Sequence, residues 1–366
     1  MLHGGGSAKS TLKRKLGHID AFYAQVESVG GCVDDMLGGL DFDALGSSLE
    51  AFFVKLRNVP APTETAQARW ATVFQFVRDT CERLERDPAM ANKMADIRTR
   101  IGRLDRLYLG LRPFKRRLGA KPRAVPARVL AELLDAATPG SETNPFRQPA
   151  TQWRFYAVVC LLLYGGLRRG EALLLPADFL KSELDVRTGR TRWHLSVRTN
   201  EAEDETRANL PSIKTAHSIR TIPVAAQTAQ GLLAYAENYR GRVEHSFYLS
   251  SARGLPLSLE GVNKGLQKLT TALSKAALDE LFDRTGARVL TPHALRHTCA
   301  VVRMKQLLEL GNTPEHAMMH LRSYFGWSKK SMMPMLYAKA ALDERLSEAW
   351  NDQLDARLSL LRSLPE

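Results

Sequence analysis

The sequence predicts a mainly α protein with a small antiparallel β-sheet, in which a helical domain precedes an α+β domain. The chain has 366 residues, more than one typical domain of about 100–200 residues needs. Apolar residues recur at helical spacing through most of it, whereas short segments in its second half alternate as β-strands do. A basic stretch with Gly and Pro separates the two parts, as expected at a domain boundary.

The helical domain is predicted over residues 41–117. Leu49, Phe52 and Leu56 share one helical face, which is the spacing of an amphipathic helix that packs on a core. The preceding residues, 1–40, are expected to form an N-terminal leader, and their Gly-rich start is typical of a flexible segment. The first domain is therefore expected to be an all-helical bundle.

The net positive charge is concentrated where the two domains meet. Between Arg98 and Arg123 the chain has ten Lys or Arg residues and one acidic residue, Asp105, so this stretch carries +9 of the formal +13. Such a run is commonly a solvated helix face with a polar linker. We favour DNA contact, because the run ends in an interdomain linker at residues 118–126 that would cross a duplex. The candidate DNA-binding residues are Arg112, Lys115, Arg116, Arg117, Lys121 and Arg123.

Composition narrows the class of partner and the compartment. The 52 Lys and Arg residues outnumber the 39 Asp and Glu residues, which favours an anionic partner, either nucleic acid or an acidic membrane surface. The longest apolar stretch, 155–167, has about 13 residues, fewer than the roughly 20 that span a bilayer, so we expect a buried helix and no membrane partner. No signal-peptide pattern is present. Scattered cysteines without CxxC spacing indicate reduced thiols in the cytoplasm and no structural metal.

The second domain is predicted over residues 127–340, followed by a C-terminal helix over residues 341–366. Alternating β-prone residues at 193–197 and 219–224 predict a small antiparallel sheet. Helices are expected over most of three further segments, 257–282, 292–310 and 314–325. The C-terminal helix carries one apolar stripe, formed by Leu342, Leu346, Trp350, Leu354, Leu358 and Leu361.

Cationic residues of this second domain suggest a site that grips phosphate. Arg168 follows two glycines, which allow a sharp turn at the end of the buried helix. His293 and Arg296 lie three residues apart, so they share a helical face, and the helix N-terminus itself favours an anion. Two planar guanidiniums suit one phosphodiester. Each string alone has a plainer meaning, such as a surface arginine paired with Glu171.

Four strings in this order resemble the tyrosine recombinase (phage integrase) family: GLRRGE at 166–171, HALRH at 293–297, Gly326-Trp327 and Leu336-Tyr337. The resemblance covers roughly residues 40–350. It implies a helical core-binding domain and an α+β catalytic domain that clamp a duplex from opposite faces. The catalytic residues that it implies are Arg168, Lys214, His293, Arg296, Trp327 and Tyr337.

The resemblance also implies a role for each residue. Tyr337 is the implied nucleophile, with Tyr324 as the fallback candidate. A phenol has a pKa near 10, so the arginines would supply a cationic field and His293 a proton relay. Lys214 is the implied general acid that protonates the leaving 5′ hydroxyl, with an exposed hairpin lysine as the alternative. Trp327 would donate its ring N–H to a phosphate oxygen or serve only in packing.

Two further residues are given supporting roles. Glu171 is implied to support the region around Arg168 rather than to react. His297 is expected to be a buried, hydrogen-bonded histidine, because a residue next to Arg296 in sequence points elsewhere on the helix.

The implied function is that of a site-specific DNA recombinase, which cleaves one strand through a 3′-phosphotyrosine and needs neither metal nor nucleotide cofactor. Double-stranded DNA is the implied partner, with a homotetramer on paired sites, a monomer without DNA, accessory recombination proteins, and a C-terminal helix that docks in cis or in trans. Integration, excision, transposition of a mobile element and chromosome resolution all stay open. Two alternatives are a type IB topoisomerase and a catalytically inactive DNA-binding member that bridges element ends.

Overall fold

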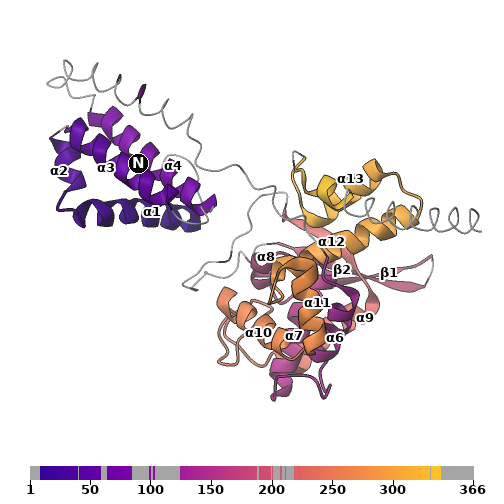
Figure 1. The fold of residues 1–366 in the computed structure, drawn as a ribbon. Helices are drawn as coiled ribbons and strands as arrows, with labels where there is room; N and C mark the ends of the chain where they lie inside the picture. Colours follow the sequence, from indigo (N-terminus) through magenta and orange to yellow (C-terminus); the bar gives the residue numbers. More distant parts are fainter. Residues whose placement is uncertain are drawn as a thin grey trace, which may run out of the picture. The chain divides into compact units, whose positions relative to one another are not determined.

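The chain forms two compact units, Met1–Gly119 and Ala120–Glu366 (Figure 1). Each unit has its own hydrophobic core. The computed structural model describes residues 9–39, 41–58, 64–84, 99, 102–103, 124–187, 189–198, 200, 207, 211, 218–329 and 331–338. The two units divide between Gly119 and Ala120. Because residues 118–123 lie outside the described part, an extended basic linker stays a prediction.

The described part of the first unit is helical. Its helices are α1 (Lys9–Glu27), α2 (Val33–Gly38), α3 (Phe42–Arg57) and α4 (Glu64–Leu84). The predicted face of α3 is confirmed, because Leu49, Phe52 and Leu56 are all buried in the core of this unit. The carboxylate of Asp41 caps α3 by accepting a hydrogen bond from the Ala44 N–H at 3.0 Å, which satisfies one of the unpaired donors of the first turn.

The structure differs from the leader predicted over residues 1–40. Residues 9–27 form α1, and its side chains Phe22 and Val26 are buried in the same core as Phe52. The rings of Phe22 and Phe52 meet edge to face, with 5.3 Å between centroids. The Gly-rich start, which suggested flexibility, lies outside the described residues. Helix α1, which follows this start in the sequence, belongs to the first unit.

The second unit confirms the predicted class, mainly α with a small antiparallel sheet. Its helices are α6 (Ala127–Ala137), α7 (Pro149–Val159), α8 (Arg169–Leu174), α9 (Ala226–Ala234), α10 (Leu259–Thr271), α11 (Lys275–Thr285), α12 (Pro292–Glu309) and α13 (Pro314–Phe325), with two π-helical turns, η2 (Cys160–Tyr164) and η4 (Tyr235–Tyr239). The sheet has the strands β1 (Leu180–Asp185), β2 (Arg190–Val197) and β3 (Arg220–Val224).

The sheet is antiparallel, with the strand order β1-β2-β3. In its register Leu195 of β2 lies opposite Leu180 of β1 and Ile222 of β3, and both Leu195 and Ile222 are buried. β1 was not predicted from the sequence. Most of its side chains are exposed, so it lacks the alternation of apolar residues that marks a half-buried strand.

Two apolar clusters fill the second unit. The larger one surrounds α7 and η2, and it confirms the buried helix predicted from the apolar stretch at 155–167. The smaller one contains Phe325, Trp327 and Tyr337. Helix α12 packs against both η2 and α13, and Figure 1 shows α12 and α13, in orange and yellow, side by side. Of the residues predicted to react, those that the structure describes therefore lie where η2, α12 and the end of α13 meet.

The described residues contain no helix that is long and apolar enough to cross a membrane. In the same part of the chain, no three His, Cys, Asp or Glu side chains are grouped so that they could hold a metal ion. The cysteines are free thiols: Cys32 is exposed, and Cys81, Cys160 and Cys299 are buried.

Candidate active site

The turn after η2 brings Arg168 and a backbone carbonyl into the site. A π-helical turn interrupts a regular helix, frequently at a functional position, and here η2 is followed by Gly165 and Gly166. Gly166 has φ +60°, and a Cβ atom on it would lie 2.5 Å from the ring of Phe325. Only glycine fits this conformation in this space. Its carbonyl oxygen accepts a hydrogen bond from Nη1 of Arg296.

Arg168 caps α8 and pairs with Glu171. The backbone N–H of Arg168 donates to Oε2 of Glu171 at 2.8 Å, and Nη1 of the same arginine donates to Oε1. The alternative named for the string at 166–171, an arginine that pairs with Glu171, is therefore seen in the structure. The side chain of Arg168 is still 29 % exposed, so it is only partly buried.

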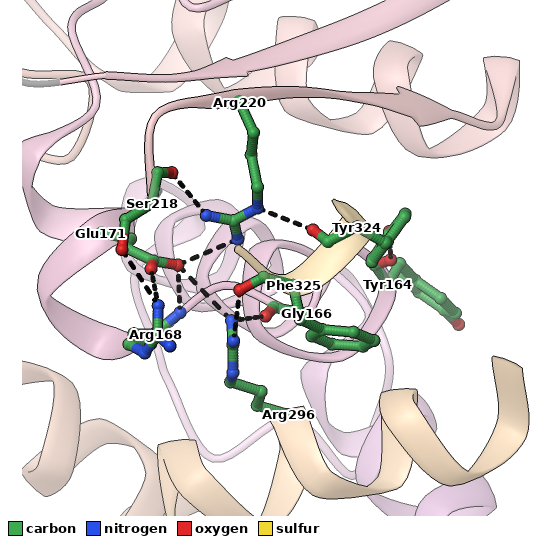
Figure 2. Close-up of polar contacts among 9 residues, drawn as sticks. All are labelled: Tyr164, Gly166, Arg168, Glu171, Ser218, Arg220, Arg296, Tyr324 and Phe325. Carbon is green, nitrogen blue, oxygen red and sulfur yellow. Dashed lines mark hydrogen bonds and ion pairs between the residues drawn. The ribbon is translucent and has the colours of Figure 1, made fainter. Parts of the chain in front are cut away.

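Glu171 joins three arginines from three parts of the chain (Figure 2). Its side chain is 1 % exposed, and its Oε2 atom lies 3.1 Å from Nη2 of Arg220 and 3.5 Å from Nη1 of Arg296. Burial alone would raise the pKa of this carboxyl group, but Arg220 and Arg296 outweigh it and hold the pKa below its ordinary value. With Arg168, the group has three positive charges and one negative, a net charge of +2.

Arg296 is the most enclosed of the three arginines. It is 4 % exposed, its Nη2 donates to the Phe325 carbonyl oxygen at 2.7 Å, and its guanidinium lies over the rings of Phe325 and Trp327, 4.9 and 5.8 Å from their centroids. Burial lowers its pKa to about 9, so it stays charged at neutral pH. Its donors point at protein acceptors, and a phosphate would have to replace some of them.

Arg220 belongs to the site, although the sequence did not single it out. Its Nη1 donates to the Ser218 carbonyl oxygen at 2.7 Å, and its Nε donates to the Tyr324 carbonyl oxygen at 2.6 Å. With its bond to Glu171, it connects β3 with the end of α13 (Figure 2). One signal in the sequence could have identified Arg220: it is a charged residue within the alternating segment 219–224. An arginine that is buried at such a position needs several hydrogen-bond acceptors.

Tyr337, His297 and His293 form a hydrogen-bonded row. The hydroxyl of Tyr337, which is 1 % exposed, contacts Nδ1 of His297. Nε2 of His297 lies 2.6 Å from Nε2 of His293, whose ring is exposed. The sequence predicts a buried, hydrogen-bonded His297 in a supporting role. In the structure its ring is half-buried, and its partners are Tyr337 and His293, which lies four residues earlier on α12.

The surroundings set opposite protonation preferences for these groups. Burial lowers the pKa of His297 to about 4, and the positive charges of His293 and Arg296 add to this. Burial raises the pKa of Tyr337, and the charge of Arg296 opposes that rise only in part. At neutral pH the phenol therefore keeps its proton, and the neutral imidazole can accept it as a hydrogen bond.

Trp327 packs between two aromatic rings. It stacks on Phe325 at 4.7 Å and on Tyr337 at 5.4 Å between centroids, with interplanar angles of 14° in both pairs. Gly326, at φ +60°, ends α13 and turns the chain toward this stack. These contacts show a packing role that fixes the ring of Tyr337. Donation of the Trp327 ring N–H to a phosphate oxygen stays a prediction.

The fallback nucleophile, Tyr324, lies apart from the histidine row. Its hydroxyl donates to the Tyr164 carbonyl oxygen at 2.9 Å, and its ring lies 3.9 Å below the guanidinium of Arg303. Burial is the main reason that its pKa is raised. This bond ties the hydroxyl to the last residue of η2, and the carbonyl oxygen that accepts it is not a general base.

The structure thus brings together seven of the predicted residues: Arg168, Glu171, His293, Arg296, His297, Trp327 and Tyr337. Lys214 lies outside the described residues, as do the six candidate DNA-binding residues and the apolar stripe that begins at Leu342. A phenol beside a neutral imidazole and a cationic group can in principle attack a phosphodiester.

Comparisons with known proteins give structural matches only. No family model and no curated protein matches the sequence. The crystal structure of XerA recombinase has 16 % identity and a TM-score of 0.40 over 94 % of this chain and 92 % of that chain.

Two structures of XerH site-specific recombinase match a smaller part. The post-cleavage complex with the palindromic difH substrate has 14 % identity and a TM-score of 0.43, over 63 % of this chain and 53 % of that one. The pre-cleavage complex with difH has 13 % identity and a TM-score of 0.39, over 65 % and 55 %. The match spans about half the length of the XerH chains.

Proposed function

We propose that the chain is a site-specific DNA recombinase that breaks and rejoins DNA through a 3′-phosphotyrosine at Tyr337. One observation carries the proposal: the Tyr337 hydroxyl contacts the imidazole of His297, while the guanidinium of Arg296 lies over the ring of Trp327 on which Tyr337 stacks. A phenol that is to attack phosphorus needs a proton acceptor and nearby positive charge. Both contact the apolar cluster that contains Trp327 and Tyr337.

The reaction would proceed by transfer of a phosphodiester to Tyr337. The phenol oxygen attacks phosphorus, the bond to the 5′ oxygen breaks, and that oxygen takes a proton from Lys214, the general acid that the family resemblance implies. Arg168 and Arg296 would bind the non-bridging oxygens, where charge develops in the transition state. Attack of a 5′ hydroxyl on the phosphotyrosine reverses these steps and joins the strands without a cofactor.

DNA would be held by the basic stretch that ends in the linker. This stretch carries +9 of the formal charge, enough to release many counterions from a duplex, so binding should weaken steeply with salt.

On paired sites we propose a homotetramer, linked by the apolar stripe of the C-terminal helix in trans. Deletion of residues 341–366 should then abolish assembly on paired sites and leave binding to a single site. Free thiols suit the reducing cytoplasm.

The enclosed state of the site favours one second candidate function. Tyr337 and Arg296 are both almost fully buried, so cleavage requires that DNA binding open the cluster and exchange the carbonyl partners of Arg296 for phosphate oxygens. A DNA-binding protein that bridges element ends without cleaving them would not need this opening.

Capture of a covalent adduct distinguishes the two functions. Duplexes would be selected from a random-sequence library by binding to the full chain, nicked at successive positions, and incubated with wild type, Tyr337→Phe and Tyr324→Phe. We expect a denaturant-resistant adduct in wild type and in Tyr324→Phe, and none in Tyr337→Phe. Tight binding with no adduct in any of the proteins would replace the recombinase with the bridging protein.

A further inference from the structure

The Tyr337 hydroxyl is connected to solvent by two imidazoles. His297 contacts this hydroxyl through Nδ1 and reaches His293 through Nε2, at 2.6 Å. The two histidine rings lie 4.0 Å apart in an edge-to-face arrangement, and the rings of His297 and Tyr337 lie 5.3 Å apart. His293 is exposed, whereas Tyr337 is fully buried. A proton that leaves the buried phenol therefore has one continuous row of hydrogen-bonding atoms ahead of it.

We propose that His297 is a catalytic residue that accepts the proton of Tyr337 during attack and passes a proton on to His293, which releases it to solvent. This inference rests on the proposed recombinase function and assigns the base of its first step. It keeps the proton-relay role that the resemblance implies for His293 and makes this histidine the outer member of the relay.

The proton balance fixes one tautomer for each histidine. Before attack, His297 has its proton on Nε2, so that Nδ1 accepts from the Tyr337 O–H while Nε2–H donates to Nε2 of His293. As the Tyr337 oxygen bonds to phosphorus, its proton moves to Nδ1 of His297, and the Nε2 proton moves to His293. His293 then loses its Nδ1 proton to water. Both histidines are neutral before and after the transfer, and the proton released to water balances the proton that leaves Tyr337.

The environment of His297 favours passing the accepted proton on over keeping it on the imidazole. Burial and the neighbouring charges of His293 and Arg296 keep its pKa near 4, so a proton held there at neutral pH would be unstable. A second acceptor is therefore required within hydrogen-bond distance, and His293 is placed there. The base and its outlet lie four residues apart on α12, on one face of the helix.

The competing role for His297 is positional, as a hydrogen-bond acceptor that only orients the Tyr337 ring. Two substitutions separate the roles. His297→Asn keeps an acceptor near the place of Nδ1 but cannot pass a proton through, and His297→Phe keeps the ring volume without an acceptor. A positioning role predicts that the asparagine variant is active, whereas a relay predicts that both variants are slow.

The test measures the rate of adduct formation on the selected nicked duplex, for the full-length wild type, His297→Asn, His297→Phe and His293→Gln. General-base catalysis contributes typically about 10²–10⁴-fold, so we expect both His297 variants to slow attack by that range and His293→Gln to slow it as well. Folding and binding are checked by the thermal midpoint and by duplex affinity, which should match wild type in the asparagine variant. Wild-type rates in His297→Asn would overturn the relay alone.

A second substrate separates the base from the acid side of the reaction. A duplex with sulfur in place of the bridging 5′ oxygen has a thiol leaving group, with a pKa of about 8.5, which departs without a general acid. The His297 variants should stay slow on this duplex, because their defect lies in deprotonation of the nucleophile. Recovery to the wild-type rate would contradict the assignment. A wild-type chain without any adduct would overturn the recombinase function together with the relay.

The hydrogen bond can be tested without DNA. In ¹⁵N spectra of the histidines, Tyr337→Phe should shift the Nδ1 resonance of His297 toward that of an imidazole nitrogen without a donor, and Tyr324→Phe should leave it unchanged. An unshifted resonance in Tyr337→Phe would remove the first step of the relay, whatever the outcome of the adduct assay.

Discussion

Arg220 donates from Nη2 to Oε2 of Glu171 at 3.1 Å, and both side chains are buried. This ion pair lies at the centre of the site, because the same carboxylate contacts Arg168 and Arg296 and the same guanidinium holds the Tyr324 carbonyl oxygen. Buried ions are costly to leave without partners, so each member of the pair affects the position of the others.

Removal of the charge at Glu171 should destabilise the second unit strongly. Glu171→Gln keeps the shape of the side chain but leaves the charges of three guanidiniums uncompensated, and breaking a buried pair in this way typically costs about 3–5 kcal/mol. The matched control is Glu260→Gln, which breaks an exposed pair with Lys264 and should change stability little. Urea unfolding measures both. Equal midpoints for the two variants would contradict the central role of Glu171.

Arg220 should affect attack more than DNA binding. Arg220→Lys keeps one charge but cannot reach Glu171 and the two carbonyl oxygens together, so the end of α13, and with it Trp327 and Tyr337, should be held less firmly. We expect slower adduct formation with duplex affinity near wild type. Arg192→Lys, on the exposed part of β2, is the control. Equal losses of affinity and rate would instead indicate that Arg220 contacts DNA directly.

Gly166 should tolerate no side chain. In Gly166→Ala the new Cβ would lie 2.5 Å from Phe325 and 3.0 Å from the Cys299 sulfur, and overpacking of this kind costs about 1–3 kcal/mol. Its left-handed backbone adds about 1–2 kcal/mol for an L-residue. Gly286→Ala isolates the second effect, because Gly286 has φ +70° and nothing within 4 Å of a Cβ. Denaturant midpoints of the two variants should differ by the clash alone.

The stability of the fold should depend on His297 in mildly acidic solution. Burial, together with the charges of His293 and Arg296, lowers the pKa of His297 in the folded chain to about 4. Between that value and about pH 6.5, the ordinary pKa of histidine, the unfolded chain binds a proton at His297 and the folded chain does not. The contribution of His297 to the free energy of unfolding is therefore complete above about pH 6.5 and is lost as the pH falls toward 4. His297→Phe should therefore lose less stability than wild type between pH 7 and pH 4.5.

The control for this measurement is His316→Gln, which alters an exposed histidine of α13. It should follow the wild-type slope of urea midpoint against pH. A wild-type slope in His297→Phe would mean that this imidazole binds a proton as readily in the folded chain as in the unfolded chain, which would contradict the lowered pKa of His297.

Helix α13 could be predicted because its signals lie close together in the sequence. The site could be predicted only in part, because it depends on contacts between residues that are far apart in the sequence. Thr313 and Pro314 start this helix, and Gly326 ends it in the left-handed conformation, all of which are signals within a few residues. By contrast, Arg296 is held by the carbonyl of Gly166, 130 residues earlier in sequence. Periodicity cannot show that such a guanidinium is turned inward, because the acceptor has no side chain to recognise.

The histidine row shows where sequence reasoning stopped too early. The spacing of His293 and His297 already placed both on one face of α12. What it could not supply was the identity of the third member, since Tyr337 is 40 residues later and reaches His297 only through the turn at Gly326 and the stack on Trp327. Arg220 was missed for a similar reason: its acceptors come from three separate segments.

The two main-chain carbonyls that hold Arg296 have a consequence for anyone who redesigns this protein. Oxygen atoms of Gly166 and Phe325 are the acceptors, and every amino acid supplies the same oxygen. Substitution at position 325 would therefore test the ring and leave the acceptor in place. The orientation of this guanidinium depends on the path of the backbone as well as on Glu171, so substitutions that keep the turn at Gly166, the end of α13 and this carboxylate should preserve it.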